Sequence, residues 1–226
     1  MNTLLKNSGI NFIFLLLIGI IWNCKEKREL ELPPQETSVT KQISPAIKEL
    51  LQFANINFTD TTDISNLLVF KLIDKNGEVL ISDLEKNTKI YKNLIKGRST
   101  SELLIFENIE SDEAILVIQS RGSVGAIWSK IIIDNNRKKI LKLQFEHMAE
   151  SEGYGDAIIQ SSFENQFVGI VLGTDLRDFG LKQNGMALIE GANMIDGISG
   201  ATITSKAAVE MINNGLLKYQ NYMNQP

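Results

Sequence analysis

The chain has 226 residues, a formal net charge of −4 and a hydrophobic fraction of 43%. This length supports one sizeable core, and a second full domain is not expected once the termini are discounted. One histidine and one cysteine are too few for a structural zinc site, a Cys-x-x-Cys redox pair or an iron–sulfur cluster held by thiolates. The charge gives no basic footprint, so nucleic acid is not an expected partner. Any redox role must come from an organic cofactor or from a metal held by oxygen ligands.

The N-terminus contains a short apolar run, Phe12 to Trp22, without a polar member. As a helix it would rise about 16 Å, which is well short of the ~30 Å hydrocarbon core of a bilayer. Lys6 precedes the run and Cys24 follows it, which is the layout of a secretory signal. A cysteine at this boundary resembles a bacterial lipoprotein signal. Residues 1–24 are therefore predicted to be a signal and lipid-anchor segment, with Cys24 lipidated.

An uncleaved, tilted anchor helix is the alternative for the same segment. Three basic residues between positions 25 and 28 argue against export under either interpretation, because basic residues favour the cytoplasmic side. Both interpretations tether the protein to a membrane. We expect a bacterial cell-envelope protein whose domain lies on the periplasmic, extracytoplasmic side.

Residues 25–44 contain two prolines and few apolar side chains, and are predicted to be a flexible linker. The globular domain is predicted to occupy residues 45–226. Pro45 suits the first turn of a helix, and apolar residues follow it at helical spacing. A second short helix is predicted over Asp83–Leu94.

From position 67 onward, short apolar runs alternate with turn residues, which predicts strands. The predicted strands are Leu67–Ile73, Glu78–Ile81, Leu103–Phe106, Ala114–Gln119, Ala126–Ile133, Ile140–Phe145 and Phe167–Leu172. Asp134-Asn135-Asn136 between two of them indicates a hairpin. The fold class is predicted to be α+β, with a mixed or antiparallel sheet, flanking helices and a C-terminal helix.

The C-terminal helix is predicted to begin between Ser199 and Ser205 and to run to about Tyr222. Its expected apolar face comprises Ile203, Ala207, Ala208, Met211, Ile212 and Leu216.

The segment before this helix, Asp196 to Ser205, reads D-G-I-S-G-A-T-I-T-S. Its glycines let the backbone turn sharply and let a ligand approach closely. Its hydroxyl side chains gather where free N–H groups and the positive end of a helix dipole favour a phosphate. The same pattern is typical of a plain helix N-cap. Spacing alone favours the plain cap and keeps the phosphate site as the alternative.

These ten residues resemble the flavinylation motif of the FMN-binding domain family. The family includes the externally facing flavin subunits of the sodium-translocating NADH:quinone reductase and of the Rnf-type ferredoxin:NAD oxidoreductase. In it, a threonine that closes a Ser-Gly-Ala-Thr core is joined to the FMN phosphate by a phosphoester bond. The resemblance assigns this role to Thr202, and Asp196, Ser199, Gly200 and Ala201 fit the pattern.

A second segment, Glu150 to Gly155, reads E-S-E-G-Y-G and resembles the E-T-P-G-L-G loop that lies against the flavin in the same family. Tyr154 is interpreted either as a ring that stacks on the isoalloxazine or as an ordinary rim or core tyrosine. The resemblance implies cofactor contacts for Glu150, Ser151, Gly153, Tyr154 and Gly155.

A third, weaker segment at 121–128 resembles a glycine-rich turn of the family that leads into a strand. Within it, Trp128 is predicted to belong to the core rather than to contact the cofactor. His147 lies close to the second segment, and no role is assigned to it.

The resemblance implies an electron-transfer flavoprotein with covalent FMN. A threonine hydroxyl is a weak nucleophile, so a separate flavin transferase is expected to attach the cofactor. The favoured function is a subunit of an NADH:quinone reductase or Rnf-type complex, with integral membrane redox subunits as partners. A free-standing flavin lipoprotein that passes electrons to an extracytoplasmic acceptor is the first alternative. A non-redox envelope binding module is the second.

Overall fold

The computed structural model describes residues 43–136 and 138–225. The predicted signal segment 1–24, with Cys24, and residues 25–42 of the predicted linker lie outside the described residues. None of the helices in the described ranges is long and apolar enough to cross a membrane.

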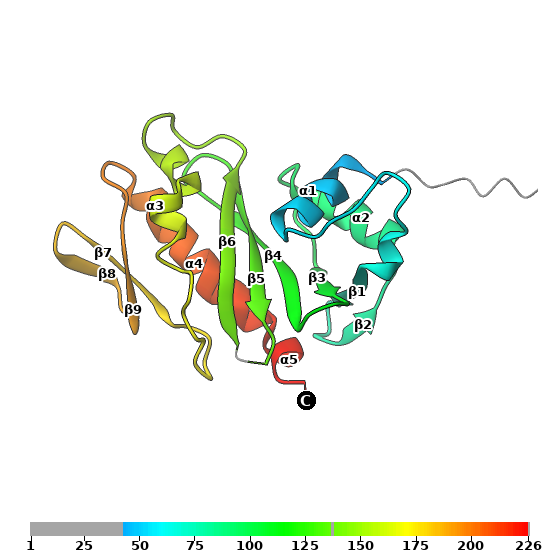
Figure 1. The fold of residues 1–226 in the computed structure, drawn as a ribbon. Helices are drawn as coiled ribbons and strands as arrows, with labels where there is room; N and C mark the ends of the chain where they lie inside the picture. Colours follow the sequence, from blue (N-terminus) through cyan, green and yellow to red (C-terminus); the bar gives the residue numbers. More distant parts are fainter. Residues whose placement is uncertain (1–42, 137, 226) are drawn as a thin grey trace, which may run out of the picture. The chain divides into compact units, whose positions relative to one another are not determined.

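The described domain is built on a six-stranded antiparallel sheet with the order β2-β1-β3-β4-β5-β6 (Figure 1). Its strands are β1 (Leu68–Ile73), β2 (Val79–Ile81), β3 (Leu103–Asn108), β4 (Glu113–Arg121), β5 (Ala126–Asp134) and β6 (Lys139–His147). The middle of β4 is apolar on both faces, because each face of the sheet is covered by a separate layer.

Two helices, α1 (Pro45–Phe53) and α2 (Leu84–Leu94), contribute to the cluster on one face of this sheet. Each begins at a side-chain N-cap, Ser44 for α1 and Asp83 for α2, as is usual where the first N–H groups of a helix need acceptors. A short 3₁₀ turn, η1 (Ile64–Asn66), precedes β1.

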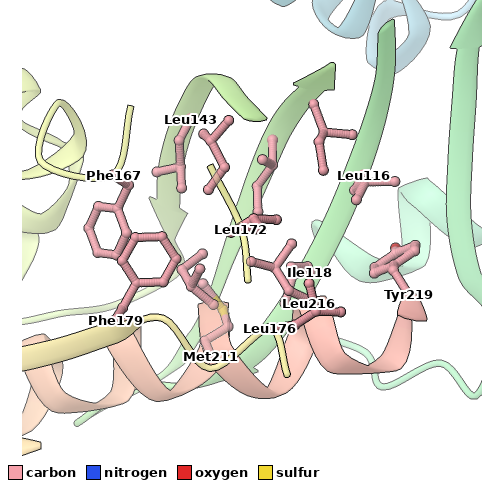
Figure 2. Packing of buried hydrophobic residues seen from close by; sticks show 14 of the residues in the cluster. Leu116, Ile118, Leu143, Phe167, Leu172, Leu176, Phe179, Met211, Leu216 and Tyr219 are labelled. Atoms are coloured by element: carbon pink, nitrogen blue, oxygen red, sulfur yellow. The ribbon is translucent and has the colours of Figure 1, made fainter. Parts of the chain in front are cut away.

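The long helix α4 (Thr202–Lys218) covers the other face and is followed by α5 (Gln220–Met223). Figure 2 shows Leu116 and Ile118 of β4 in the same apolar layer as Met211 and Leu216 of α4. At the end of α4, the buried hydroxyl of Tyr219 lies within hydrogen-bonding distance of backbone carbonyls of β3 and β4. The C-terminal end of the helix is therefore fixed against the sheet.

The connection from β6 to α4 contains the remaining elements: η2 (Gly155–Ile159), α3 (Ser161–Glu164) and a small sheet with the order β8-β7-β9. The strands are β7 (Phe179–Gln183), β8 (Met186–Ile189) and β9 (Asn193–Asp196). The side chain of Asn213 in α4 bonds both the N–H and the C=O of Phe179, which joins β7 to the helix.

The predicted α+β class, with an antiparallel sheet, flanking helices and a C-terminal helix, is confirmed. The helices predicted at Pro45 and at Asp83–Leu94 are present, and the predicted hairpin joins β5 to β6. The last helix begins within the predicted window but ends at Lys218, before a separate final turn.

The strand predicted at Phe167–Leu172 is wrong. The segment runs beside the start of β6 and forms a single bridge, between Val171 and Lys139. Gly169 has φ +84°, which interrupts the extended backbone that a strand needs. Phe167 and Leu172 are apolar because they pack into the core from an irregular segment.

Candidate functional site

The carboxylate of Glu150 lies at the centre of the predicted site. Glu150 is buried, with 8% of its surface exposed. It accepts hydrogen bonds from the N–H groups of Ser123 (3.2 Å), Val124 (3.0 Å) and Gly125 (3.1 Å), and from the hydroxyl of Thr204 (2.6 Å). One side chain therefore joins the β4–β5 turn, the loop after β6 and the first turn of α4.

Electrostatics keep this carboxylate ionised. Burial by itself would raise the pKa of Glu150. The hydrogen bonds from Thr204 and from the three backbone N–H groups outweigh burial and hold that pKa below its ordinary value of 4.5. The network is thus built around a carboxylate anion, which makes its hydrogen bonds stronger than those of a neutral acceptor.

Tyr154 and Gly200 bring the two sequence motifs together. Gly200 has φ +77°, and a Cβ atom on it would lie 2.6 Å from Cδ1 of the Tyr154 ring. Only glycine fits both the backbone angle and the space. Tyr154 itself is 56% exposed. It is a rim tyrosine whose ring covers the turn before α4.

Gly155 is required by the same close packing. A Cβ atom at this position would lie 2.8 Å from the Thr204 hydroxyl oxygen and 3.0 Å from Oε2 of Glu150. The loop can pass beneath the first turn of α4 because it has no side chain there.

The N-terminus of α4 has no side-chain cap. Its N-cap residue is Ala201, and the first backbone bond of the helix runs from the Ser205 N–H to the Ala201 carbonyl. Across the described ranges, the N–H groups of Thr202, Ile203 and Thr204 have no hydrogen-bond acceptor. The plain N-cap favoured by spacing alone is therefore not what the turn forms, and donors that an anion could use are left free.

The hydroxyl groups of the motif divide into two classes. Those of Thr204 and Ser205 are buried and fix the turn, since Thr204 bonds Glu150 and Ser205 accepts the N–H of Ile198. Ser199 and Thr202 are exposed residues, and no hydrogen bond of their hydroxyl groups is found within the described ranges. Thr202 is therefore an exposed residue in the same helical turn as the free N–H groups.

Asp196 is the last residue of β9 and lies just before the turn that leads into α4. Its carboxylate pairs with the side chain of Lys182 at 3.3 Å. The backbone N–H and C=O of Asp196 are both bonded by the side chain of Gln166. The side-chain amide of Gln183 donates to the carbonyl of Ile198. Gln166 and Gln183 therefore hold the end of β9 and the turn after it in place.

Three exposed apolar residues lie on the segments that meet at the free turn. Val124, Tyr154 and Ile203 are 52%, 56% and 67% exposed and come from the three segments that Glu150 joins. The expectation that Ile203 belongs to the buried face of the helix is wrong, because it lies in the first turn, beyond the part of α4 that packs on the sheet. Neither Val124 nor Ile203 is among the site residues expected from the sequence.

The residues present fit a flavin mononucleotide. Free N–H groups suit its phosphate, an exposed hydroxyl suits a phosphoester, and exposed apolar side chains suit the isoalloxazine ring. Ser151 and Gly153 lie in the same loop and are exposed. The Nδ1 atom of His147 accepts the N–H of Glu150. Trp128 is buried in the core, as predicted.

Residues 122–217 match the FMN-binding domain family, which confirms the resemblance drawn from the two motifs. The chain is 27% identical over 177 residues to the NqrC subunit of the Na(+)-translocating NADH-quinone reductase of Chlamydia caviae. That alignment covers 70% of this chain and 56% of the relative, so the chain spans a little over half the length of the curated relative.

Two crystal structures share the fold. The NqrC subunit of the Na(+)-translocating NADH-quinone reductase of Parabacteroides distasonis superposes with a TM-score of 0.62 at 24% identity, covering 80% of this chain and 94% of that one. NqrC of Shewanella oneidensis superposes with a TM-score of 0.60 at 16% identity, covering 79% and 96%.

Proposed function

We propose that this FMN-binding domain carries FMN covalently on Thr202 and transfers electrons at the outer face of a bacterial membrane. The observation that carries the proposal is the exposed position of Thr202 at the uncapped N-terminus of α4. It is supported by the family match over residues 122–217. When bound, FMN supplies the redox chemistry, by accepting and releasing electrons.

The chain's own residues hold and orient the group. The N–H groups at the start of α4 would neutralise the phosphate, with help from the helix dipole. Glu150 fixes the relative positions of the three segments that carry Val124, Tyr154 and Ile203. Both carboxylate oxygens of Glu150 accept hydrogen bonds from these segments. Its role is therefore to position the site rather than to bind the cofactor.

Attachment requires a partner enzyme. The described residues offer the Thr202 hydroxyl no carboxylate or imidazole partner that could serve as a base. A flavin transferase would supply that base and present FAD. The Thr202 oxygen would bond to the FMN phosphorus, the pyrophosphate bond would break, AMP would leave, and the hydroxyl proton would pass to the transferase.

The proposed setting is a membrane NADH–quinone reductase complex. It is supported by the alignment with the NqrC subunit of the Chlamydia caviae enzyme. The free-standing flavin lipoprotein remains the alternative, with an extracytoplasmic acceptor in place of membrane subunits. Purification of the full chain from its native membrane separates the two, because a member of the complex brings integral membrane redox subunits with it.

The test of the site is co-expression of the full chain with a flavin transferase, followed by denaturation and intact-mass measurement. We expect flavin fluorescence that survives denaturation and a mass increase of one FMN less one water. Thr202→Ala should lose both signals. Thr174→Ala removes an exposed threonine outside the motif and should keep both.

Two outcomes would contradict the proposal. Flavin retained through denaturation in Thr202→Ala would place the attachment elsewhere. A wild-type chain that stays colourless with an active transferase would favour the non-redox binding module.

A further inference from the structure

A basic face lies apart from the cofactor site, on helix α2 and the turn after it. We define the basic face as Lys86, Lys89, Lys92, Lys96 and Arg98, all of which are exposed. The first four recur at intervals of three or four residues, which places them on one side of the helix. The opposite side of α2 is buried against the sheet.

The cations of this face are largely unpaired. Lys86 bonds Glu102 at 2.8 Å. Within residues 43–136 and 138–225, Lys89, Lys92 and Lys96 have no carboxylate partner. A solvated helix face commonly alternates positive and negative side chains. Here five cations share the surface with only two carboxylates among the residues that line it, those of Glu85 and Glu102. In a chain of net charge −4, this is a local reversal of sign.

The basic face borders a hollow with an apolar floor. The hollow lies between α1 and α2 and measures about 600 Å³. Ile43, Ile47 and Leu84 line it together with Lys89, Lys92 and Lys96. Apolar surface rimmed by lysines is the arrangement that suits a lipid headgroup region, where apolar groups and cations are satisfied at different depths.

The chain enters the domain at this hollow, because Ile43 and Ser44 line it. Cys24 is the predicted anchor point, and the 18 residues from 25 to 42 reach at most about 60 Å when fully extended. The basic face is therefore the part of the domain next to the end of the predicted tether.

We propose that the basic face docks the domain on a membrane surface by binding anionic phospholipid headgroups. The proposal rests on the membrane tether of the proposed function. Helix α4 lies on the other face of the sheet from α2, so docking through α2 leaves the first turn of α4 free for a redox partner.

The test uses the full chain on vesicles of phosphatidylcholine and on vesicles of an equal mixture of phosphatidylcholine and phosphatidylglycerol. Lysines are acetylated briefly, and the modification of each is measured by mass spectrometry. We expect modification of Lys89, Lys92 and Lys96 to fall several-fold on the anionic vesicles, and high salt to remove the protection. Lys75 and Lys206, which are exposed elsewhere, should react equally on both.

A matched pair of variants tests whether charge is the cause. Lys89→Glu/Lys92→Glu should abolish the protection of Lys96, whereas Lys75→Glu/Lys206→Glu should leave it intact. Equal modification of the three lysines on both vesicles, or protection of Lys96 that survives Lys89→Glu/Lys92→Glu, would overturn the proposal.

The result is separable from the flavin and from the tether. Thr202→Ala should give the wild-type protection pattern, because the basic face does not involve the cofactor. A chain that floats with anionic vesicles but not with neutral ones would still support the basic face, and would overturn the membrane tether of the proposed function instead.

Discussion

The hydroxyl of Thr204 donates a 2.6 Å hydrogen bond to the carboxylate of Glu150, across 54 positions of sequence. The same carboxylate holds three consecutive N–H groups of the β4–β5 turn. An acidic residue in this loop is thereby explained without a cofactor contact. The site is rigid because one buried anion joins the segments that form it.

Glu150→Gln should destabilise the domain by about 1–3 kcal/mol, because hydrogen bonds to a charged acceptor become weaker or unsatisfied. A glutamine has one acceptor oxygen for donors that now use two. Glu152→Gln is the matched control, since Glu152 is exposed in the same loop and should change the free energy of unfolding by less than about 0.5 kcal/mol. Urea unfolding measures both, and equal effects would contradict the positioning role.

The pH dependence of stability should reveal the same group. Because the folded-state pKa of Glu150 is lowered from its ordinary value of 4.5, its contribution is fully present above pH 4.5 and is lost as pH falls through the lowered value. Glu150→Gln should therefore flatten the acid side of the curve of unfolding free energy against pH, relative to Glu152→Gln. A Glu150→Gln curve parallel to the wild type would contradict the lowered pKa.

Gly200→Ala and Gly185→Ala separate steric overlap from backbone strain. Both glycines have φ +77°, but a Cβ at Gly200 meets the Tyr154 ring, whereas one at Gly185 meets nothing within 4 Å. Gly185→Ala should cost about 1–2 kcal/mol from the left-handed backbone alone. Gly200→Ala should cost about 1–3 kcal/mol more. In a Tyr154→Ala background the difference should disappear, and thermal unfolding that shows equal costs in both backgrounds would argue against the contact.

Local signals predict most of the frame. Pro45 and Asp83 mark helix starts, and alternating or continuous apolar runs mark the strands of the large sheet. The small sheet escapes prediction because its strands are short and partly exposed. The segment Phe167–Leu172 is mistaken for a strand because an irregular segment pressed on a core carries the same apolar pattern.

The site is predicted through motifs rather than contacts. The resemblance to the family identifies Thr202 and the Glu150 loop as candidates. In the structure the two motifs lie next to each other, with the ring of Tyr154 packed against Gly200. Val124 carries no sequence signal of its own, because its position is set by the hydrogen bond from its N–H to Glu150, 26 positions away. Non-local pairings of this kind are set by the fold, so a single sequence does not display them.

Lys130 of β5 lies on the face of the sheet that α1 covers, opposite α4. Its side chain is 2% exposed and pairs with Glu49 of α1 and Glu146 of β6. Burial raises the pKa of Glu146, and the neighbouring Lys130 opposes that rise. Lys130→Met removes the cation and leaves the half-buried carboxylate of Glu146, which is 28% exposed, without its partner. This loss should cost about 1–3 kcal/mol at neutral pH.

The loss in Lys130→Met should shrink in acid. The half-buried carboxylate of Glu146 has a raised pKa, so it destabilises the fold as pH rises from 4.5 through that raised value, and protonation at lower pH relieves the cost. Glu146→Gln in the Lys130→Met background should recover part of the stability for the same reason. Lys182→Met is the matched control, because Lys182 and Asp196 are 45% and 72% exposed and such pairs contribute about 0–1 kcal/mol. Urea unfolding at neutral and acid pH checks each step, and a pH-independent loss in Lys130→Met would show that packing, rather than the unpaired Glu146, is the cause.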